Sequence, residues 1–190
     1  MKILKQQCEA AIIGKLEVMT RNLYLPDLAI YTREGNSYHN FAQVKKIEEL
    51  LKKQGDGFRV AAKKDFEYLS SLGSCWCKQG KKSNVYAGRL FGNKNKEGAT
   101  VFLPAVGYYC YNIFEKNYSL VDYGSCAAYW SSTYYDDRYS YYLSFDSDML
   151  PDTSMVGAND YGRSIRCVRN FLTKSEYQPV KKIHKNSIKL

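Results

Sequence analysis

Residues 129–146 read YWSSTYYDDRYSYYLSFD, and this stretch decides the fold class. Its two ends lie in the segments AAYWSST (127–133) and YSYYLSF (139–145), which consist mainly of residues that favour β-strands. Between them lies the polar segment YYDDR, residues 134–138, whose charges and hydroxyls favour an exposed loop. The stretch therefore predicts two strands with an exposed loop between them.

Side-chain alternation assigns the faces of the second strand. If Leu143 and Phe145 point into the core, Tyr139 and Tyr141 share that face. The outward face then carries Ser140, Tyr142, Ser144 and Asp146. On the first strand we expect Trp130 in the core, with its indole N–H bonded to a carbonyl.

Further short segments that favour β-strands surround this stretch. They are NVYAGRLFG (84–92), ATVFLPA (99–105) and RSIRCVR (163–169), and turn residues separate them in GNKNKEG (92–98), DSDMLPD (146–152) and GAND (157–160). The second half of the chain thus predicts a run of strands.

The first half predicts two helices. Phe41, Val44, Ile47, Leu50 and Leu51 fall on one face of a helix that Asn40 or Ser37 could cap and Gly55 or Gly57 could end. A second helix is expected over 63–72, with Phe66, Leu69 and Leu72 on its inner side and Gly73 after its end.

Shorter features complete the first half. A short strand is expected in KLEVM (15–19), a short strand or a turn in GFRV (57–60), and a loop in NLYLPDLAIYTREGNS (22–37). Helices followed by a run of strands predict an α+β fold with an antiparallel sheet.

Composition fits one soluble globular domain. Of the 190 residues, 45% are hydrophobic and 25% are charged, and no apolar run is long enough to span a membrane. The start of the chain lacks the apolar region of a signal peptide, which predicts an unexported, by default cytoplasmic, protein. We expect one domain over residues 1–172.

The net charge of +9 is concentrated partly in a basic segment at 173–190. That segment carries Lys174, Lys181, Lys182, Lys185 and Lys189 against Glu176 alone. We expect it to be a flexible tail that could tether the domain to an anionic surface. Charged surface segments are more often simply solvated, and we disfavour nucleic acid as a partner.

Catalytic and metal-binding patterns are weak. The six cysteines are expected to be reduced and mostly buried, and the Cys75–Cys77 spacing differs from that of zinc or redox motifs. Asp136–Asp137 and Asp146–Asp148 could bind calcium or act as acid and base, but carboxylates in polar loops are usually solvated. We therefore expect no metal and no cofactor.

Several motifs occur together in a known order. The blocks are GATVFLPAVGY (98–108), YWSST (129–133), YYLSF (141–145) and SIRCVR (164–169), with weaker matches in LEVMTRNL (16–23), GFRVAAKKDFEYL (57–69) and SCW (74–76), the last as a turn. Over residues 16–170 the chain resembles the Fibrobacter succinogenes major paralogous domain family.

The resemblance implies a C-type-lectin-like fold, in which two helices pack on twisted antiparallel strands and long late loops form a ligand-binding surface. It also implies kinship with formylglycine-generating enzymes and with the diversified variable proteins of diversity-generating retroelements, and a cell-surface or extracellular location.

Four departures from the family pattern bear on function. Val60-Ala61-Ala62 replaces Leu-Pro-Thr before the second helix, and Asn159 replaces an Arg three residues before Gly162. The calcium-binding tripeptides of sugar-binding lectins are absent, and Ala158-Asn159-Asp160 matches one of them only in part. The paired active-site cysteines of formylglycine-generating enzymes have no counterpart.

Tyrosine, serine, aspartate and arginine together are typical of antibody binding surfaces. We therefore predict a non-enzymatic module that binds a protein or glycan, with its oligomeric state left open. The predicted site is Tyr134, Tyr135, Asp136, Asp137, Arg138, Ser140, Tyr142, Ser144, Asp146, Asp148, Asn159 and Asp160. The alternative is an enzyme with Cys110, Cys126 or Cys167 as the reactive thiol.

Overall fold

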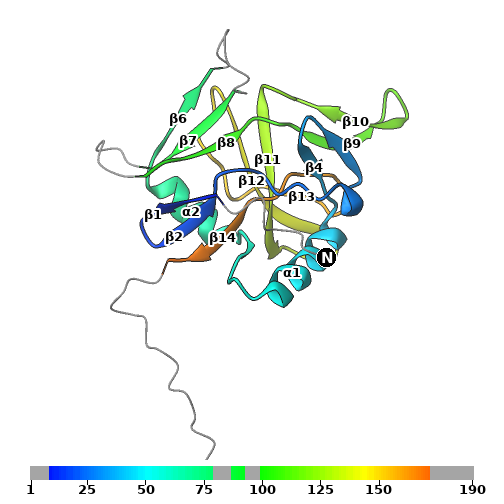
Figure 1. Cartoon of the computed structure of the whole chain (residues 1–190). Coiled ribbons are helices and arrows are strands. Elements are labelled where there is room, and N and C mark those ends of the chain that lie inside the picture. Colours follow the sequence, from blue (N-terminus) through cyan, green and yellow to red (C-terminus); the bar gives the residue numbers. More distant parts are fainter. Residues whose placement is uncertain (1–8, 79–86, 93–98, 172–190) are drawn as a thin grey trace, which may run out of the picture.

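Strands from both ends of the fold pair at the centre of its main sheet. The computed structural model describes residues 9–78, 87–92 and 99–171. In the main sheet the order is β1 (Ala10–Ile13), β2 (Leu16–Met19), β14 (Cys167–Asn170) and β5 (Arg59–Val60), and all neighbours are antiparallel. The pairing of β2 with β14 joins the start of the described chain to its end (Figure 1).

The remaining strands form small antiparallel sheets. One contains β11 (Cys126–Tyr134), β12 (Tyr139–Asp146) and β13 (Val156–Ala158), and another contains β6 (Ser74–Cys77), β7 (Gly88–Phe91) and β8 (Val101–Pro104). Two hairpins join β3 (Tyr31–Arg33) to β4 (Asn36–Tyr38) and β9 (Tyr108–Asn112) to β10 (Asn117–Val121). The predicted α+β class with antiparallel strands is confirmed.

Both predicted helices are present. Helix α1 spans Phe41–Gln54, and Asn40 rather than Ser37 caps it, because the Gln43 N–H donates to Asn40 Oδ1 at 3.1 Å and the Asn40 N–H donates back to Gln43 Oε1 at 2.9 Å. Gly55 ends the helix with a φ of 77°, a left-handed conformation that glycine adopts without strain. Helix α2 spans Lys63–Ser71.

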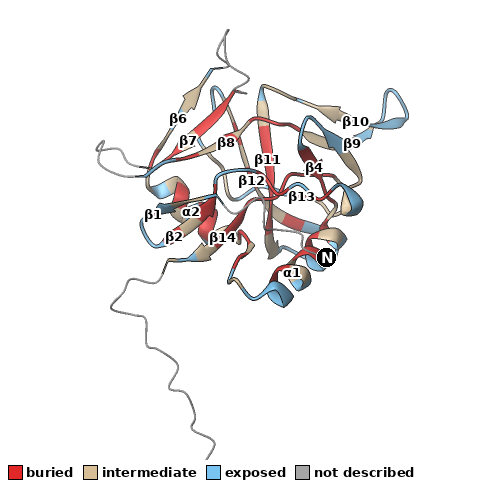
Figure 2. Ribbon diagram, in the orientation of Figure 1, coloured by how far each residue is buried: buried red, intermediate tan, exposed pale blue. Residues whose placement is uncertain are grey.

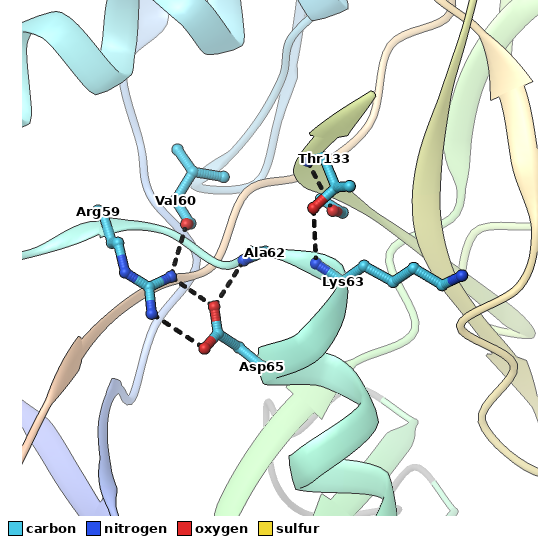
Figure 3. A network of polar contacts seen from close by, with 7 residues as sticks. Arg59, Val60, Ala62, Lys63, Asp65 and Thr133 are labelled. Carbon is cyan, nitrogen blue, oxygen red and sulfur yellow. Dashed lines mark hydrogen bonds and ion pairs between the residues drawn. The ribbon is translucent and has the colours of Figure 1, made fainter. Parts of the chain in front are cut away.

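The start of α2 is capped by a carboxylate within the helix. Ala62 has no side chain that could cap the helix, and the Asp65 carboxylate instead accepts the Ala62 N–H at 2.7 Å. Arg59 holds that carboxylate through both of its terminal nitrogens (Figure 3). The Lys63 N–H donates to Thr133 Oγ1 at 3.1 Å, which ties the helix to β11.

Replacing Asp65 by asparagine is expected to lower the free energy of unfolding by about 2 kcal/mol, because the buried carboxylate holds both Arg59 and the helix start. Urea unfolding at neutral pH measures the loss. Glu67→Gln is the matched control, since the Glu67 carboxylate makes only an exposed 3.9 Å pair with Lys63. Equal effects of the two substitutions would contradict this role of Asp65.

Strand β11 separates two hydrophobic cores, and consecutive residues point into opposite ones. Tyr129 packs in the core that holds Leu143 and Phe145, whereas Trp130 packs in the core that holds Phe41. Residues 127–131 of the strand are therefore all buried, whichever way their side chains point (Figure 2). Trp130 is fully buried, and its Nε1–H donates to the His39 carbonyl at 2.7 Å, as predicted.

Three sequence-based expectations were wrong. The expected loop at 22–37 contains η1 (Pro26–Leu28), β3 and the start of β4, whose hairpin turn uses positive φ at Glu34 and Gly35. The expected turn at SCW is strand β6, and the expected turn GAND begins inside β13. The hairpin of β9 and β10 was not predicted, because its YYCYN and NYSLV strands lack a clear alternation of polar and apolar residues.

Some expectations concern residues outside the described ranges. These are the absence of a signal peptide at the start of the chain, Cys8, the turn at 93–98 and the basic segment at 173–190. Among the helices that the structure does describe, none combines the length and apolar character needed to cross a bilayer.

Candidate functional site

The predicted loop 134–138 lies at the surface. Tyr135 is 58% exposed, and Asp136 shapes the loop by accepting the N–H groups of Arg138 and Tyr139, each at 2.8 Å. Tyr134 is exposed on one side only, because its ring packs edge-on against Phe41 at 4.8 Å. The loop thus offers Tyr135, Asp137 and Arg138 to solvent.

The acidic residues after this loop mostly organise backbone. Asp146 accepts the N–H groups of Asp148 and Met149 at 2.8 and 2.6 Å, and Asp148 is exposed. Asp160 accepts a hydrogen bond from the Tyr118 hydroxyl at 3.3 Å, and the Asn159 amide donates to the Asp137 carbonyl at 3.2 Å. Across the described ranges, no three His, Cys, Asp or Glu side chains gather in a way that could hold a metal ion.

The predicted outward face of β12 is covered, which corrects the expectation for Ser140. Ser140 has no exposed surface, because it pairs with Gly157 of β13 and lies on the face over which residues 161–163 pass. Tyr142 and Ser144 share that face as predicted and are half-buried. Alternation assigned the face correctly but could not show what lies over it.

The expectation that Tyr139 and Tyr141 point into the core was also wrong. Tyr139 is 41% exposed, and Tyr141 is half-buried, with its ring against Tyr135 at 5.5 Å and Lys63 at 4.0 Å. The core ends at Leu143, and the register of β11 against β12 shifts between Trp130 and Tyr134.

The covered face forms the floor of a pocket of about 470 Å³, here named the Arg163 pocket. Residues from β9, β11, β12, β13 and the segments beside them line it. They are Tyr108, Asp122, Cys126, Ala128, Tyr139, Tyr142, Ser144, Met155, Val156, Gly157, Ala158, Tyr161 and Arg163. Tyr142 and Ser144 are the members of the predicted site that lie in it, and the other ten predicted residues lie outside this lining.

Arg163 is the central feature of the pocket. Its side chain is 2% exposed, and its guanidinium carbon lies 4.0 Å from the Tyr142 ring centre and 4.1 Å from that of Trp130. The rings of Tyr161 and Tyr108 are next, at 5.4 and 5.9 Å. Aromatic faces attract a cation, so these rings hold the guanidinium in place.

The charge of Arg163 has no acidic partner among the residues that the structure describes. Within the ranges that the structure describes, no carboxylate lies within ion-pair distance of it, and its Nε and Nη1 have no hydrogen-bond partner. Burial lowers the pKa of Arg163, and the neighbouring phenols, Tyr142 first, offset part of that effect. A buried cation without a counter-ion costs free energy that a ligand anion could recover.

The Tyr108 phenol and the Cys126 and Cys110 thiols near Arg163 are held in their neutral forms. Burial, with Asp122 as the next cause, raises the pKa of Tyr108 to about 12. Burial also raises the pKa of Cys126, which lines the pocket, and of Cys110. A thiol with a raised pKa is a weak nucleophile at neutral pH.

The cysteines are less buried than expected. Of the five in the described part of the chain, Cys167 alone is buried, Cys75 is exposed, and the other three are half-buried. The expectation failed because Cys75 lies on β6, a strand predicted as a turn, with one face toward solvent.

Sequence reasoning missed Arg163, Tyr108 and Tyr161 as site residues. Arg163 opens the RSIRCVR segment, where it was read as part of a strand, and its placement over β12 depends on contacts between distant segments. The one available signal was charge: Arg163 and Arg166 flank Ile165 in a segment expected to be a strand, and a charge that is buried there needs a specific partner.

Comparisons with known proteins give one match. A family model described as "Domain of unknown function (DUF8237)" matches residues 74–171. Neither the curated proteins nor the solved structures contain a match. The matched segment runs from β6 to just beyond β14 and contains every residue that lines the Arg163 pocket.

Proposed function

The chain belongs to the family of the Domain of unknown function (DUF8237), whose matched segment contains the whole pocket, and on that premise we propose that it is a non-enzymatic ligand-binding module with the Arg163 pocket as its ligand site. The observation that carries the proposal is the buried Arg163, which lies against the rings of Trp130 and Tyr142 and has no ion-pair partner among the described residues. A fold that only needed a packed core would place a neutral side chain there.

The surface around the pocket favours a protein as the ligand. Residues 134–156 include seven exposed large apolar or aromatic side chains, which are Tyr134, Tyr135, Tyr139, Met149, Leu150, Met155 and Val156. Tyrosine and methionine are enriched at protein interfaces, where they supply contact area at a low cost in conformational entropy. Met155 and Val156 also line the pocket, so this surface and the pocket are continuous.

The alternative, an enzyme with a reactive thiol, has less support. Cys126 is the thiol that lines the pocket, but burial raises its pKa, and the same holds for Cys110 and Cys167. His39 has no exposed surface and so cannot serve as a general base for a bound substrate. Labelling the native protein with a thiol reagent separates the two functions: the enzyme requires Cys126 to react ahead of the exposed Cys75.

We propose further that the scaffold is C-type-lectin-like. Two helices beside small antiparallel sheets, and a pocket built from the last strands and the segments between them, agree with that arrangement. The resemblance of residues 16–170 to the Fibrobacter succinogenes major paralogous domain family supports the same proposal. A diversified binding protein would be consistent with this scaffold.

Replacing Tyr139 by alanine is expected to weaken binding of a protein ligand at least about tenfold, because truncating an aromatic anchor at the centre of an interface costs about 2 kcal/mol. The ligand would be selected from a displayed library of random peptides and measured with purified components. Tyr111→Ala is the matched control, since Tyr111 is 42% exposed and Tyr139 41%, but Tyr111 lies on β9 outside the pocket. Equal losses in the two variants, or none, would contradict the placement of the site.

A further inference from the structure

We propose that the Arg163 pocket accepts a carboxylate group of the ligand, which would supply the counter-ion that the guanidinium lacks. This inference rests on the proposed binding function and specifies the chemistry of the ligand. Three observations carry it: the geometry around Arg163, the charges of the pocket and the glycine beside the guanidinium.

The guanidinium of Arg163 lies in the lining of the pocket, close enough for its charge to attract a bound anion. Arg163 lines a pocket large enough for a small polar group, and its side chain is 2% exposed. The rings of Trp130 and Tyr142, which are paired residues on neighbouring strands, both lie against it. In a buried environment of low dielectric constant, an unpaired charge attracts an opposite charge more strongly than it does in water.

The charges of the pocket favour a singly charged anion. Arg163 is the cationic side chain in the lining and Asp122 the acidic one, and no ion pair among the described residues joins the two, so the guanidinium can pair with a ligand that carries one negative charge. The Asp122 carboxylate repels any anion, and it repels a phosphate dianion about twice as strongly as a carboxylate. A carboxylate is singly charged, and it is planar like the guanidinium.

Gly157 allows the guanidinium to lie against the backbone of β13. A Cβ atom built at Gly157 would lie 2.1 Å from Nη2 of Arg163 and 2.7 Å from its central carbon. Any larger residue at this position would have to displace the guanidinium. Glycine at position 157 therefore leaves room for the Arg163 guanidinium. A guanidinium that served packing alone would not require a glycine there.

The test uses two matched pairs of small probes, added to the ¹⁵N-labelled full chain and followed by amide chemical shifts. One pair is N-acetyl-glutamate methylamide and its glutamine counterpart, and the other is methyl β-D-glucuronide and methyl β-D-glucoside. We expect each acid to shift the amides of Tyr142, Gly157 and Ser164, and at least one acid to bind about tenfold or more tighter than its neutral counterpart. The pair with the larger ratio identifies the source of the carboxylate as an acidic side chain or an acidic sugar.

Variants tie the preference for the acid to Arg163. Arg163→Met is expected to abolish the tighter binding of the acid probe over its neutral counterpart. Arg21→Met deletes an exposed arginine that is far from the pocket lining in the sequence, and this variant is expected to keep the preference for the acid. If Arg163→Met does not fold, Gly157→Ala serves instead, because it keeps the charge but displaces the guanidinium, and a several-fold loss of the preference is expected.

Three results would overturn the carboxylate proposal. They are equal binding of acid and neutral probes, no shift at the pocket amides, and tighter binding of inorganic phosphate than of either acid. Each leaves the proposed binding function to be judged separately, since the comparison of Tyr139→Ala with Tyr111→Ala does not depend on the charge of the ligand.

Discussion

Trp130→Ala is expected to lower the free energy of unfolding by about 4 kcal/mol, a large part of the stability of a domain of this size. The indole is fully buried and packs edge-on against Phe41 at 5.4 Å, so truncation leaves a cavity. It also removes the hydrogen bond to the His39 carbonyl and one of the two nearest rings that hold Arg163. Urea unfolding followed by far-UV circular dichroism measures the loss.

Two further variants separate the causes of this loss. Trp130→Phe keeps a ring in the core but removes the indole N–H, and we expect a smaller loss of about 1–2 kcal/mol. Trp76→Ala is the matched control, because Trp76 is only half-buried on β6. A loss for Trp130→Ala no greater than that for Trp76→Ala would contradict its central place in the core.

The sequence predicted those parts of the fold that depend on local pattern. Helix α1 was predicted with its apolar face because helical periodicity is local, and Asn40 was one of two candidate caps because it precedes the first apolar residue. Trp130 was predicted as buried because a large ring in a strand rarely stays in water. The turn of β3 and β4 was also local, but its Glu34–Gly35 signal was missed.

The pocket could not be predicted because contacts between distant segments create it. Arg163 follows Tyr142 by about twenty residues and reaches it only after β13 has folded back onto β12. Ser140 illustrates the same limit, since its face was assigned correctly and its burial was not. The exposed loop 134–138 was predictable because it needs no cover.

The stability of the protein is expected to fall by about 3 kcal/mol as the pH drops from about 6.5 to about 4, on account of His39 alone. His39 has no exposed surface, its Nδ1–H donates to the Leu28 carbonyl at 3.0 Å, and its Nε2 lies 2.8 Å from Ser37 Oγ. Burial lowers the pKa of His39 from 6.5 to about 4, although the hydrogen bond to Leu28 offsets part of this effect. The imidazole is therefore neutral in the folded protein.

The direction of the effect follows from proton binding. Between pH 4 and 6.5 the unfolded chain binds a proton at His39 that the folded protein does not, so the stability is complete above about 6.5 and declines as the pH falls toward about 4. Urea unfolding at intervals from pH 4 to 8 measures the decline. His39→Gln is expected to flatten the profile, and since the two proteins differ at this residue alone, the difference between their profiles isolates His39. Parallel profiles for the two proteins would show that the His39 imidazole accepts a proton in the folded state as readily as in the unfolded chain.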